Sequence, residues 1–277
     1  MRDGWKGSRS RRWAQNFLIN AGAAEAIVAA FRPRPDDAVV EIGPGRGALT
    51  RRLAGRVDRL LGVEIDPELG PALRRALADC RPAGGLEIVE GDVLEIDLAR
   101  LLRRVRSGGR PARLIANLPY NIATRVIVRC LRLRPLLSDL LVMVQREVAA
   151  RVLSAPGTKV YGGLSVLCQT YASVERVMRL RPGSFRPRPR VESEVIRLTL
   201  RDPGGAASRD FDAYAGLVRA AFARRRRTLL NNLARLPGAS PEEAGRLIRR
   251  AGLDPGMRPE AVPVDGYRAL LDAWRPL

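Results

Sequence analysis

The chain has 277 residues, 46% of them hydrophobic, and its net charge is +20 because 49 Lys and Arg outnumber 29 Asp and Glu. This length predicts a folded protein of about two domains, and no apolar run approaches the ~20 residues that cross a bilayer. The positive charge predicts a polyanionic partner, for which nucleic acid is favoured over membrane because no basic helix with an aromatic face stands out.

The sequence contains no histidine and three scattered cysteines, Cys80, Cys130 and Cys168. These absences exclude Ser-His and Cys-His nucleophilic catalysis and histidine-based zinc sites, and no two cysteines have metal-ligand spacing. We therefore expect no metal, and we expect buried thiols in a reducing cytoplasm.

The first 20 residues form a basic arm with interleaved aromatic side chains, and a helix is expected after it over residues 21–31. Basic arms are usually solvated tails. Here Trp13, Phe17 and Leu18 indicate instead that the arm folds back onto another part of the chain.

From residue 38 to about residue 200, apolar strands alternate with amphipathic helices. Strands are expected over 38–43, 59–64, 86–89, 112–117 and 139–144, and helices near 47–56, 67–78, 97–105 and 122–133. This alternation predicts an α/β fold with a doubly wound, mostly parallel sheet and right-handed crossovers. Ligands of such sheets bind at the carboxyl ends of the strands.

The second half of the chain does not keep the regular alternation of strands and helices. Residues 145–153 and 162–171 are expected to be helical, and strands over 174–180 and 191–200 flank a basic, Pro-rich segment, 181–190, which we expect to be irregular and to expose Phe185. A linker at 202–208 precedes four short helices, expected over 211–223, 226–235, 241–251 and 266–274. We therefore predict an arm (1–20), an α/β domain (21–201) and a small all-helical domain (209–277).

Two glycines, Gly43 and Gly45, follow the first strand and open a helix, where backbone N–H groups can approach a ligand. With Ala48 they also fit the dinucleotide-binding fingerprint. Glu64 closes the next strand, where its carboxylate could accept hydrogen bonds from ribose hydroxyls. These features alone would suit NAD or S-adenosylmethionine (SAM).

The third strand ends at Gly91 and Asp92, which departs from the NAD pattern. A carboxylate at this position could accept a hydrogen bond from an adenine amino group. The three strand-end signatures together favour SAM over NAD.

The fourth strand ends in a turn that contains Asn117, Leu118, Pro119 and Tyr120. Asn and Pro are common in ordinary strand-to-helix turns, and Tyr120 could simply cover the core. Alternatively, the Asn117 amide oxygen and the Leu118 carbonyl could both accept from an aromatic amine and localise its lone pair. Methyl transfer from a sulfonium mainly requires such positioning. Tyr120 and Phe185 could then stack on the two faces of the base.

Basic side chains cluster at several points of the chain. A run of arginines at a helix junction could be a solvated face, but on so basic a protein we favour contact with phosphate. The residues expected to bind RNA are Arg11, Arg12, Arg186, Arg188, Arg224, Arg225, Arg226 and Arg227.

These residues lie in runs that resemble the ribosomal RNA adenine N6,N6-dimethyltransferase family, most closely its bacterial small-subunit (16S rRNA) branch. The runs extend in order through the whole chain. They are Gln15-Asn-Phe-Leu18, Val40-Glu-Ile-Gly-Pro-Gly45, Val63-Glu-Ile-Asp66, Gly91-Asp92, Asn117-Leu-Pro-Tyr-Asn-Ile122, Gln145-Arg-Glu147, Tyr161-Gly-Gly-Leu-Ser165, Ser184-Phe-Arg-Pro-Arg-Pro-Arg-Val191, Arg225-Arg-Arg-Thr228, Gly252-Leu-Asp-Pro255 and Arg258-Pro-Glu260.

The resemblance implies a Rossmann-like SAM-dependent methyltransferase domain that makes dimethyladenosine in small-subunit rRNA during ribosome assembly. The sequence is silent on oligomeric state, for which we expect a monomer, and we expect the protein in the cytoplasm. It implies that the arm covers the cofactor. The implied SAM contacts are Gln15, Asn16, Leu18, Gly43, Gly45, Glu64, Asp92 and Asn117. The chain departs from the family pattern at Trp13, Ala14 and Gly163.

Two other interpretations share these features. A large-subunit rRNA adenine methyltransferase of the antibiotic-resistance type would have the same turn at Asn117. A non-catalytic RNA-binding assembly factor on the same fold would be equally basic, but it would not need Gly43, Glu64, Asp92 and Asn117.

Overall fold

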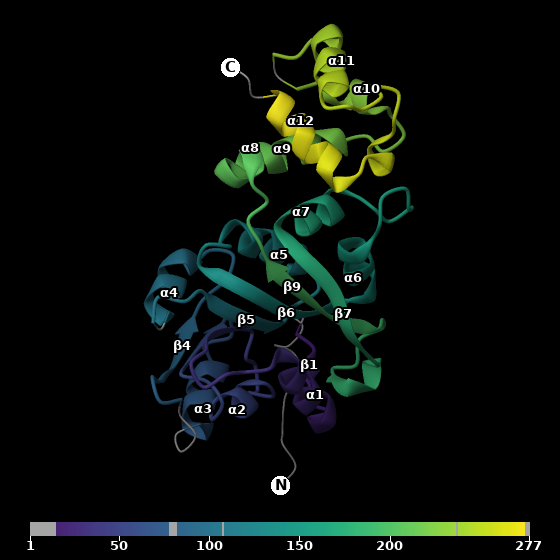
Figure 1. Ribbon diagram of the computed structural model, residues 1–277. Coiled ribbons are helices and arrows are strands. Elements are labelled where there is room, and N and C mark those ends of the chain that lie inside the picture. Colours follow the sequence, from purple (N-terminus) through teal and green to yellow (C-terminus); the bar gives the residue numbers. More distant parts are fainter. Residues whose placement is uncertain (1–14, 78–81, 107, 237, 275–277) are drawn as a thin grey trace. The chain divides into compact units, whose positions relative to one another are not determined.

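The computed structural model describes residues 15–77, 82–106, 108–236 and 238–274 (Figure 1). Contacts divide the chain into two units: unit 1 contains the residues up to 149 and residues 175–199, and unit 2 contains residues 150–174 and those from 200 onward. Each unit is described by itself. The predicted arm, α/β domain and helical domain follow the order of the chain, whereas unit 2 also includes residues 150–174.

A seven-stranded sheet has the order β4-β3-β2-β5-β6-β9-β7. Parallel pairing joins β2 to β3 and β5, β3 to β4, and β5 to β6, while β9 runs antiparallel to β6. The strands are β2 (Ala38–Ile42), β3 (Arg59–Glu64), β4 (Leu86–Glu90), β5 (Ala112–Asn117), β6 (Leu137–Gln145), β7 (Ala172–Leu180) and β9 (Ser193–Leu200). The predicted α/β fold with a mostly parallel sheet is therefore confirmed.

Helices cover both faces of the parallel strands. Figure 1 shows α1 (Ala21–Phe31), α2 (Thr50–Leu53) and α3 (Leu69–Ala76) on one side of these strands, and α4 (Leu98–Val105) and α5 (Ala123–Arg132) on the other. All five residues of β2 are buried. A strand covered on both faces needs a nearly continuous apolar run, which is why this segment lacks the alternation of a half-exposed strand.

The arm folds back as predicted for Phe17 and Leu18, whereas Trp13 lies outside the described residues. Strand β1 (Phe17–Leu18) pairs antiparallel with β8 (Phe185–Arg186), and Leu18 lies opposite Phe185. The expectation that residues 181–190 are wholly irregular is wrong, because the 3-10 helix η1 (Pro182–Ser184) and β8 lie within them. The backbone N–H of Ile19 extends this contact by donating to the Ser184 carbonyl (2.9 Å).

Two helices are shorter than expected. Helix α2 covers four of the residues predicted between 47 and 56, because Gly47 has a φ of +79°, outside the helical region. Helix α10 (Leu229–Leu233) begins later than residue 226 because Thr228 caps it, the hydroxyl accepting from the Asn231 N–H (3.2 Å).

Unit 2 is largely helical and packs around buried tyrosines. Their hydroxyls find partners within the unit: Tyr267 donates to the Pro259 carbonyl (2.7 Å) and Tyr161 to the Val262 carbonyl (3.1 Å). Its remaining helices are α7 (Gly163–Tyr171), α8 (Gly205–Arg209), α9 (Phe211–Ala221), α11 (Pro241–Arg250), η2 (Pro259–Ala261) and α12 (Val264–Trp274), and α6 (Arg146–Leu153) begins in unit 1. The expected linker at 202–208 is partly wrong, since α8 starts within it.

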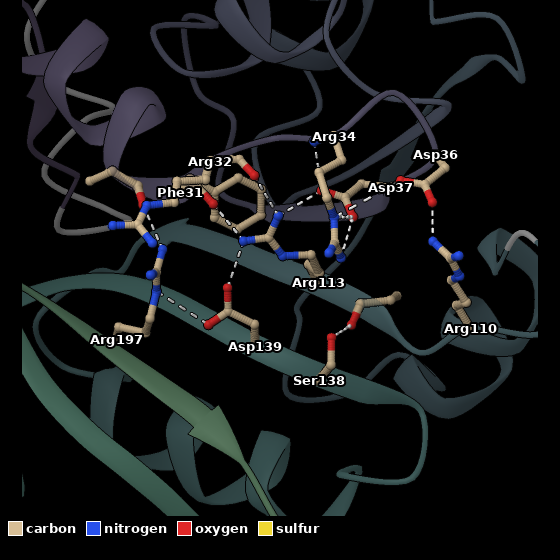
Figure 2. Close-up of polar contacts among 12 residues, drawn as sticks. Phe31, Arg32, Arg34, Asp36, Asp37, Arg110, Arg113, Ser138, Asp139 and Arg197 are labelled. Carbon is tan, nitrogen blue, oxygen red and sulfur yellow. Dashed lines mark hydrogen bonds and ion pairs between the residues drawn. The ribbon is translucent and has the colours of Figure 1, made fainter.

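The amino-terminal ends of the central strands are joined by buried charges (Figure 2). Arg113, in β5, donates to carboxylates from both neighbouring strand ends: to Asp37 (2.6 Å), just before β2, and to Asp139 (2.8 Å), in β6. Its guanidinium also lies over the Phe31 ring, 4.1 Å from the centroid. This network lies at the edge of the sheet opposite the strand ends that carry the predicted site.

Candidate active site

A cavity of about 330 Å³ lies at the carboxyl ends of the parallel strands of unit 1. Such a volume is in the range of small-molecule sites. The structure brings ten of the predicted site residues to its wall: Gln15, Asn16, Gly43, Gly45, Glu64, Asp92, Asn117, Leu118, Pro119 and Tyr120.

The glycine-rich turn after β2 takes a conformation that only glycine adopts easily. Gly43 and Gly45 have φ values of +67° and +55°. A Cβ on Gly45 would lie 3.1 Å from the Phe17 ring, so the absent side chain makes room for the arm. The Gly45 N–H is not available to a ligand, because it already donates to Glu64 Oε2 (2.9 Å).

Glu64 is 1% exposed and holds three segments together. Besides Gly45, its carboxylate accepts from the Asp66 N–H (3.0 Å) and from Gln15 Nε2 (3.4 Å). Burial raises the pKa of this carboxyl group, although the N–H groups of Asp66 and Gly45 oppose the shift. A carboxylate has about four acceptor positions, so Glu64 keeps the capacity for a further donor.

Two further residues of the cavity wall, Gln15 and Asp92, carry acceptor atoms. Gln15 Oε1 is buried and has no hydrogen-bond partner among the described residues. Asp92 uses Oδ1 to accept from the Leu94 N–H (2.8 Å), and Asp92 lines the cavity after β4. A buried acceptor without a partner lowers the stability of the folded protein. A ligand that donates a hydrogen bond to this acceptor would remove that cost, as expected of a binding site.

The orientation of the Asn117 amide is determined by the arm. Asn117 Nδ2 donates to the Asn16 carbonyl (2.9 Å), and since a carbonyl can only accept, the amide oxygen is the atom left for other partners. The adjacent Leu118 N–H forms the last strand-like bond, to Met143 O (3.1 Å).

The next residues of the turn leave a second acceptor. The Pro119 carbonyl accepts from Ile122 (3.2 Å) and Ala123 (3.1 Å) and so begins α5. In the described part of the chain, no backbone N–H donates to the Leu118 carbonyl. Two carbonyl-type oxygens in adjacent residues of one turn, from Asn117 and Leu118, therefore have no donor among the residues that the structure describes.

Two predicted site residues lie outside the wall of this cavity. Leu18 and Phe185 belong to the hydrophobic core of unit 1, with exposed fractions of 7% and 3%. The expected exposure of Phe185 is therefore wrong, because its pairing with Leu18 turns it into the core. Tyr120 does line the cavity, and its hydroxyl lies 3.0 Å from Ser193 Oγ.

The structure adds wall residues that the motifs did not single out, among them Phe17, Ile65, Val93, Ile122 and Arg125. Ile65 and Val93 directly follow the acidic strand-end residues, so reading one position further along each strand end would have found them. Arg125 comes from the first turn of α5, and no sequence motif distinguishes it from the other arginines.

Glu41 is buried beneath the glycine-rich turn, with 2% of its surface exposed. Burial raises the pKa of this carboxyl group to about 8, and the nearby Glu64 carboxylate contributes to the shift. Glu41 lines a cavity of about 30 Å³ that Asn117 also borders. Its Oε2 has no partner among the residues described.

The predicted RNA-binding arginines within the described ranges are exposed: Arg186 and Arg188 in unit 1, and Arg224, Arg225, Arg226 and Arg227 in unit 2. Arg11 and Arg12 lie outside these ranges. Arg225 differs from its neighbours because its guanidinium donates to the carbonyls of Lys159 (2.5 Å) and Tyr161 (3.3 Å).

Other classes of site find no support in the described residues. They include no group of three or more Cys, Asp or Glu side chains arranged to hold a metal ion. No helix in the same ranges is long and apolar enough to cross a membrane. Cys130 and Cys168 are free and buried, and burial raises the pKa of both thiols, that of Cys130 to about 12; Cys80 is not among the described residues.

Comparison with known proteins identifies a family. Residues 8–267 match the family described as ribosomal RNA adenine dimethylase. A protein from Geobacter metallireducens named ribosomal RNA small subunit methyltransferase A is 42% identical over 274 residues, which cover 98% of either chain.

Solved structures agree with this assignment. A dimethyladenosine transferase from Plasmodium falciparum has a TM-score of 0.74 at 24% identity and covers 92% of this chain and 95% of its own, which shows a shared fold. The 23S rRNA methyltransferase ErmE has a TM-score of 0.66 at 26% identity, over 93% of this chain and 99% of its own. The fold is thus that of Rossmann-like rRNA methyltransferases.

Proposed function

We propose, because the chain belongs to the ribosomal RNA adenine dimethylase family, that it transfers two methyl groups to N6 of adenine in small-subunit (16S) rRNA and acts in ribosome assembly. The observation that carries the proposal is the 42% identity, over nearly the full length of both chains, to a small-subunit rRNA methyltransferase. Such a substrate would place the protein in the cytoplasm, and we propose that it acts as a monomer.

The cavity suits SAM as the methyl donor. The unpaired Gln15 Oε1 and the spare acceptor capacity of Glu64 and Asp92 match the hydroxyl and amino donors of the cofactor's adenosine part. Gly43 lines the cavity without a side chain. When bound, SAM would supply an activated methyl group and a neutral thioether leaving group.

The chain's own contribution is to position and activate the acceptor amine. The lone pair of an adenine amino group is delocalised into the ring, so the amine is a poor nucleophile. We propose that Asn117 Oδ1 and the Leu118 carbonyl, which lack protein donors in the described chain, accept hydrogen bonds from its N–H groups and direct the lone pair towards the methyl group. The C–N bond forms as the sulfonium C–S bond breaks, and the proton that the methylated nitrogen then loses passes to solvent. Positioning of this kind accounts for catalysis without a histidine base.

The target base would be held by stacking on Tyr120, a residue of the cavity wall. Phe185 remains a candidate for the opposite face only if it leaves the core, since its present exposure is 3%. RNA phosphates would be bound by Arg186, Arg188 and Arg224 to Arg227, with Arg11 and Arg12 of the arm.

The test is methyl transfer from radiolabelled SAM to immature 30S particles and to protein-free 16S and 23S rRNA, followed by mass spectrometry of the nucleosides. We expect dimethyladenosine in small-subunit RNA. The likeness to ErmE keeps a large-subunit adenine methyltransferase as the second candidate, and exclusive labelling of 23S rRNA would establish it. Calorimetry that detects no SAM binding would favour a non-catalytic RNA-binding factor.

A further inference from the structure

The hydroxyl groups of Tyr120 and Ser193 form a hydrogen bond of 3.0 Å across 73 residues of sequence, within unit 1. Tyr120 belongs to the catalytic turn and lines the cavity. Ser193 does not line the cavity and belongs to none of the strand-end motifs. Its contact with the site passes through the tyrosine.

Ser193 is a rigid anchor. It is fully buried and is the first residue of β9, where it lies opposite Gln145, the last residue of β6. The pairing continues one step beyond, with the Arg146 N–H donating to the Glu192 carbonyl (3.0 Å). In the described residues, Ser193 Oγ forms no other hydrogen bond.

Tyr120 has no comparable support from its own segment. It lies in the turn between β5 and α5 and is half-buried. A side chain in such a turn would be free to change rotamer, and fixing it on binding costs about 0.5–1.5 kcal/mol, which corresponds to a factor of about 2 to 13 in affinity. A hydrogen bond that fixes the Tyr120 side chain before the base binds removes this cost.

We propose that Ser193 is a positioning residue for the methylation reaction: its hydroxyl holds the Tyr120 side chain in the rotamer that places the ring where the target adenine stacks. The inference rests on the proposed function, because it concerns the substrate base of that site.

Two substitutions remove the same bond from its opposite ends. We expect Ser193→Ala and Tyr120→Phe each to raise the KM for RNA about 3- to 10-fold, with kcat for Ser193→Ala near the wild-type value, because stacking is equal in the ground and transition states. The double variant should be no worse than either single variant. SAM affinity by calorimetry and Tm should stay unchanged for both.

Thr199→Val serves as the matched control, since it removes an exposed hydroxyl from the same strand. If the increases in the KM for RNA multiply in the double variant, or if SAM affinity falls with Ser193→Ala, the positioning role is overturned and Ser193 has a structural role. Wild-type kinetics in both single variants would also overturn it and leave the proposed function standing. Failure of the wild-type protein to methylate rRNA would instead refute the proposed function.

Discussion

The side chain of Asn117 has two polar atoms, and the arm uses one of them. Its Nδ2 donates to the Asn16 carbonyl, which leaves Oδ1 as the atom that we propose to accept from a substrate amine. One residue thus connects the part of the arm that lines the cavity to the proposed chemistry. The arm is therefore expected to affect the orientation of the catalytic amide as well as access to the site.

We expect Asn117→Ala to lower kcat/KM for methylation by about 10²- to 10³-fold, the usual effect of deleting one preorganised polar group in a catalytic site. RNA affinity should stay nearly unchanged, because the phosphate contacts are elsewhere. Asn231→Ala, at an exposed position of α10, is the control. Equal losses of RNA binding and of catalysis would mean that Asn117 is structural.

We expect Glu41→Gln to stabilise the protein increasingly as the pH rises. The folded-state pKa of Glu41 is about 8, against an ordinary value of 4.5, so the folded chain retains a proton that the unfolded chain releases. The stability due to this proton is complete below the unfolded pKa and is lost as the pH rises through about 8, at up to about 1.4 kcal/mol per pH unit. Glutamine has no such proton to lose.

Urea unfolding at several pH values between about 5 and 8 would measure the difference between Glu41→Gln and wild type. Glu87→Gln, at a half-exposed side chain, should show no comparable trend. Parallel stability curves for Glu41→Gln and wild type would show that Glu41 is ionised in the folded state.

Among the elements, β5 is the strand whose position most affects the candidate active site, because it lies between β2 and β6 and ends at Asn117. At its other end the Arg113 guanidinium joins Asp37 and Asp139 from the two neighbouring strand ends (Figure 2). The strand is thus fixed by charge at its beginning and carries the site at its end.

We expect Arg113→Ala to lower the free energy of unfolding by about 3–5 kcal/mol, because it removes the buried guanidinium between Asp37 and Asp139 and leaves these carboxylates only the more distant contacts with Arg34 and Arg197. Removing the exposed partner in the Arg104–Glu87 pair, by Arg104→Ala, should cost less than about 1 kcal/mol. Urea denaturation followed by circular dichroism measures both. Similar losses of unfolding free energy for the two variants would show that the Arg113 network stabilises the protein no more than a surface ion pair does.

At the scale of the whole molecule, the net charge of +20 favours a polyanionic partner. The salt dependence of RNA binding would then report how many phosphates the arginines contact. Arg226 and Arg227 are exposed, whereas Arg225 is bonded to two backbone carbonyls of its own unit. The four arginines are therefore not equivalent as candidate phosphate ligands, because Arg225 also connects segments of its own unit.

We expect the double substitution Arg226→Ala and Arg227→Ala to weaken RNA binding and to reduce the slope of log K against log salt by about 1.4–1.8, that is, about 0.7–0.9 for each lost phosphate contact. Binding isotherms at several salt concentrations measure the slope. Arg104→Ala, which removes an exposed arginine of unit 1, should leave it unchanged. A slope that does not change in the double variant would remove these residues from the interface.

The sequence by itself determined the α/β sheet and four of its strand ends, because strands buried on both faces need apolar runs and their polar ends interrupt those runs at Gly43, Glu64, Asp92 and Asn117. Motif spacing also favoured SAM over NAD as the cofactor. These signals are local, and each can be read within about ten residues of chain.

Only the tertiary structure decided which atoms of those residues are free. The bond from Gly45 to Glu64, the contact of Asn117 with Asn16 and the pairing of Leu18 with Phe185 join segments between 19 and 167 residues apart. Residue type does not encode such long-range pairing, since it depends on where the completed sheet and arm place each backbone. That is why Phe185 was expected at the surface and lies in the core, and why Ser193 had no signal in the sequence.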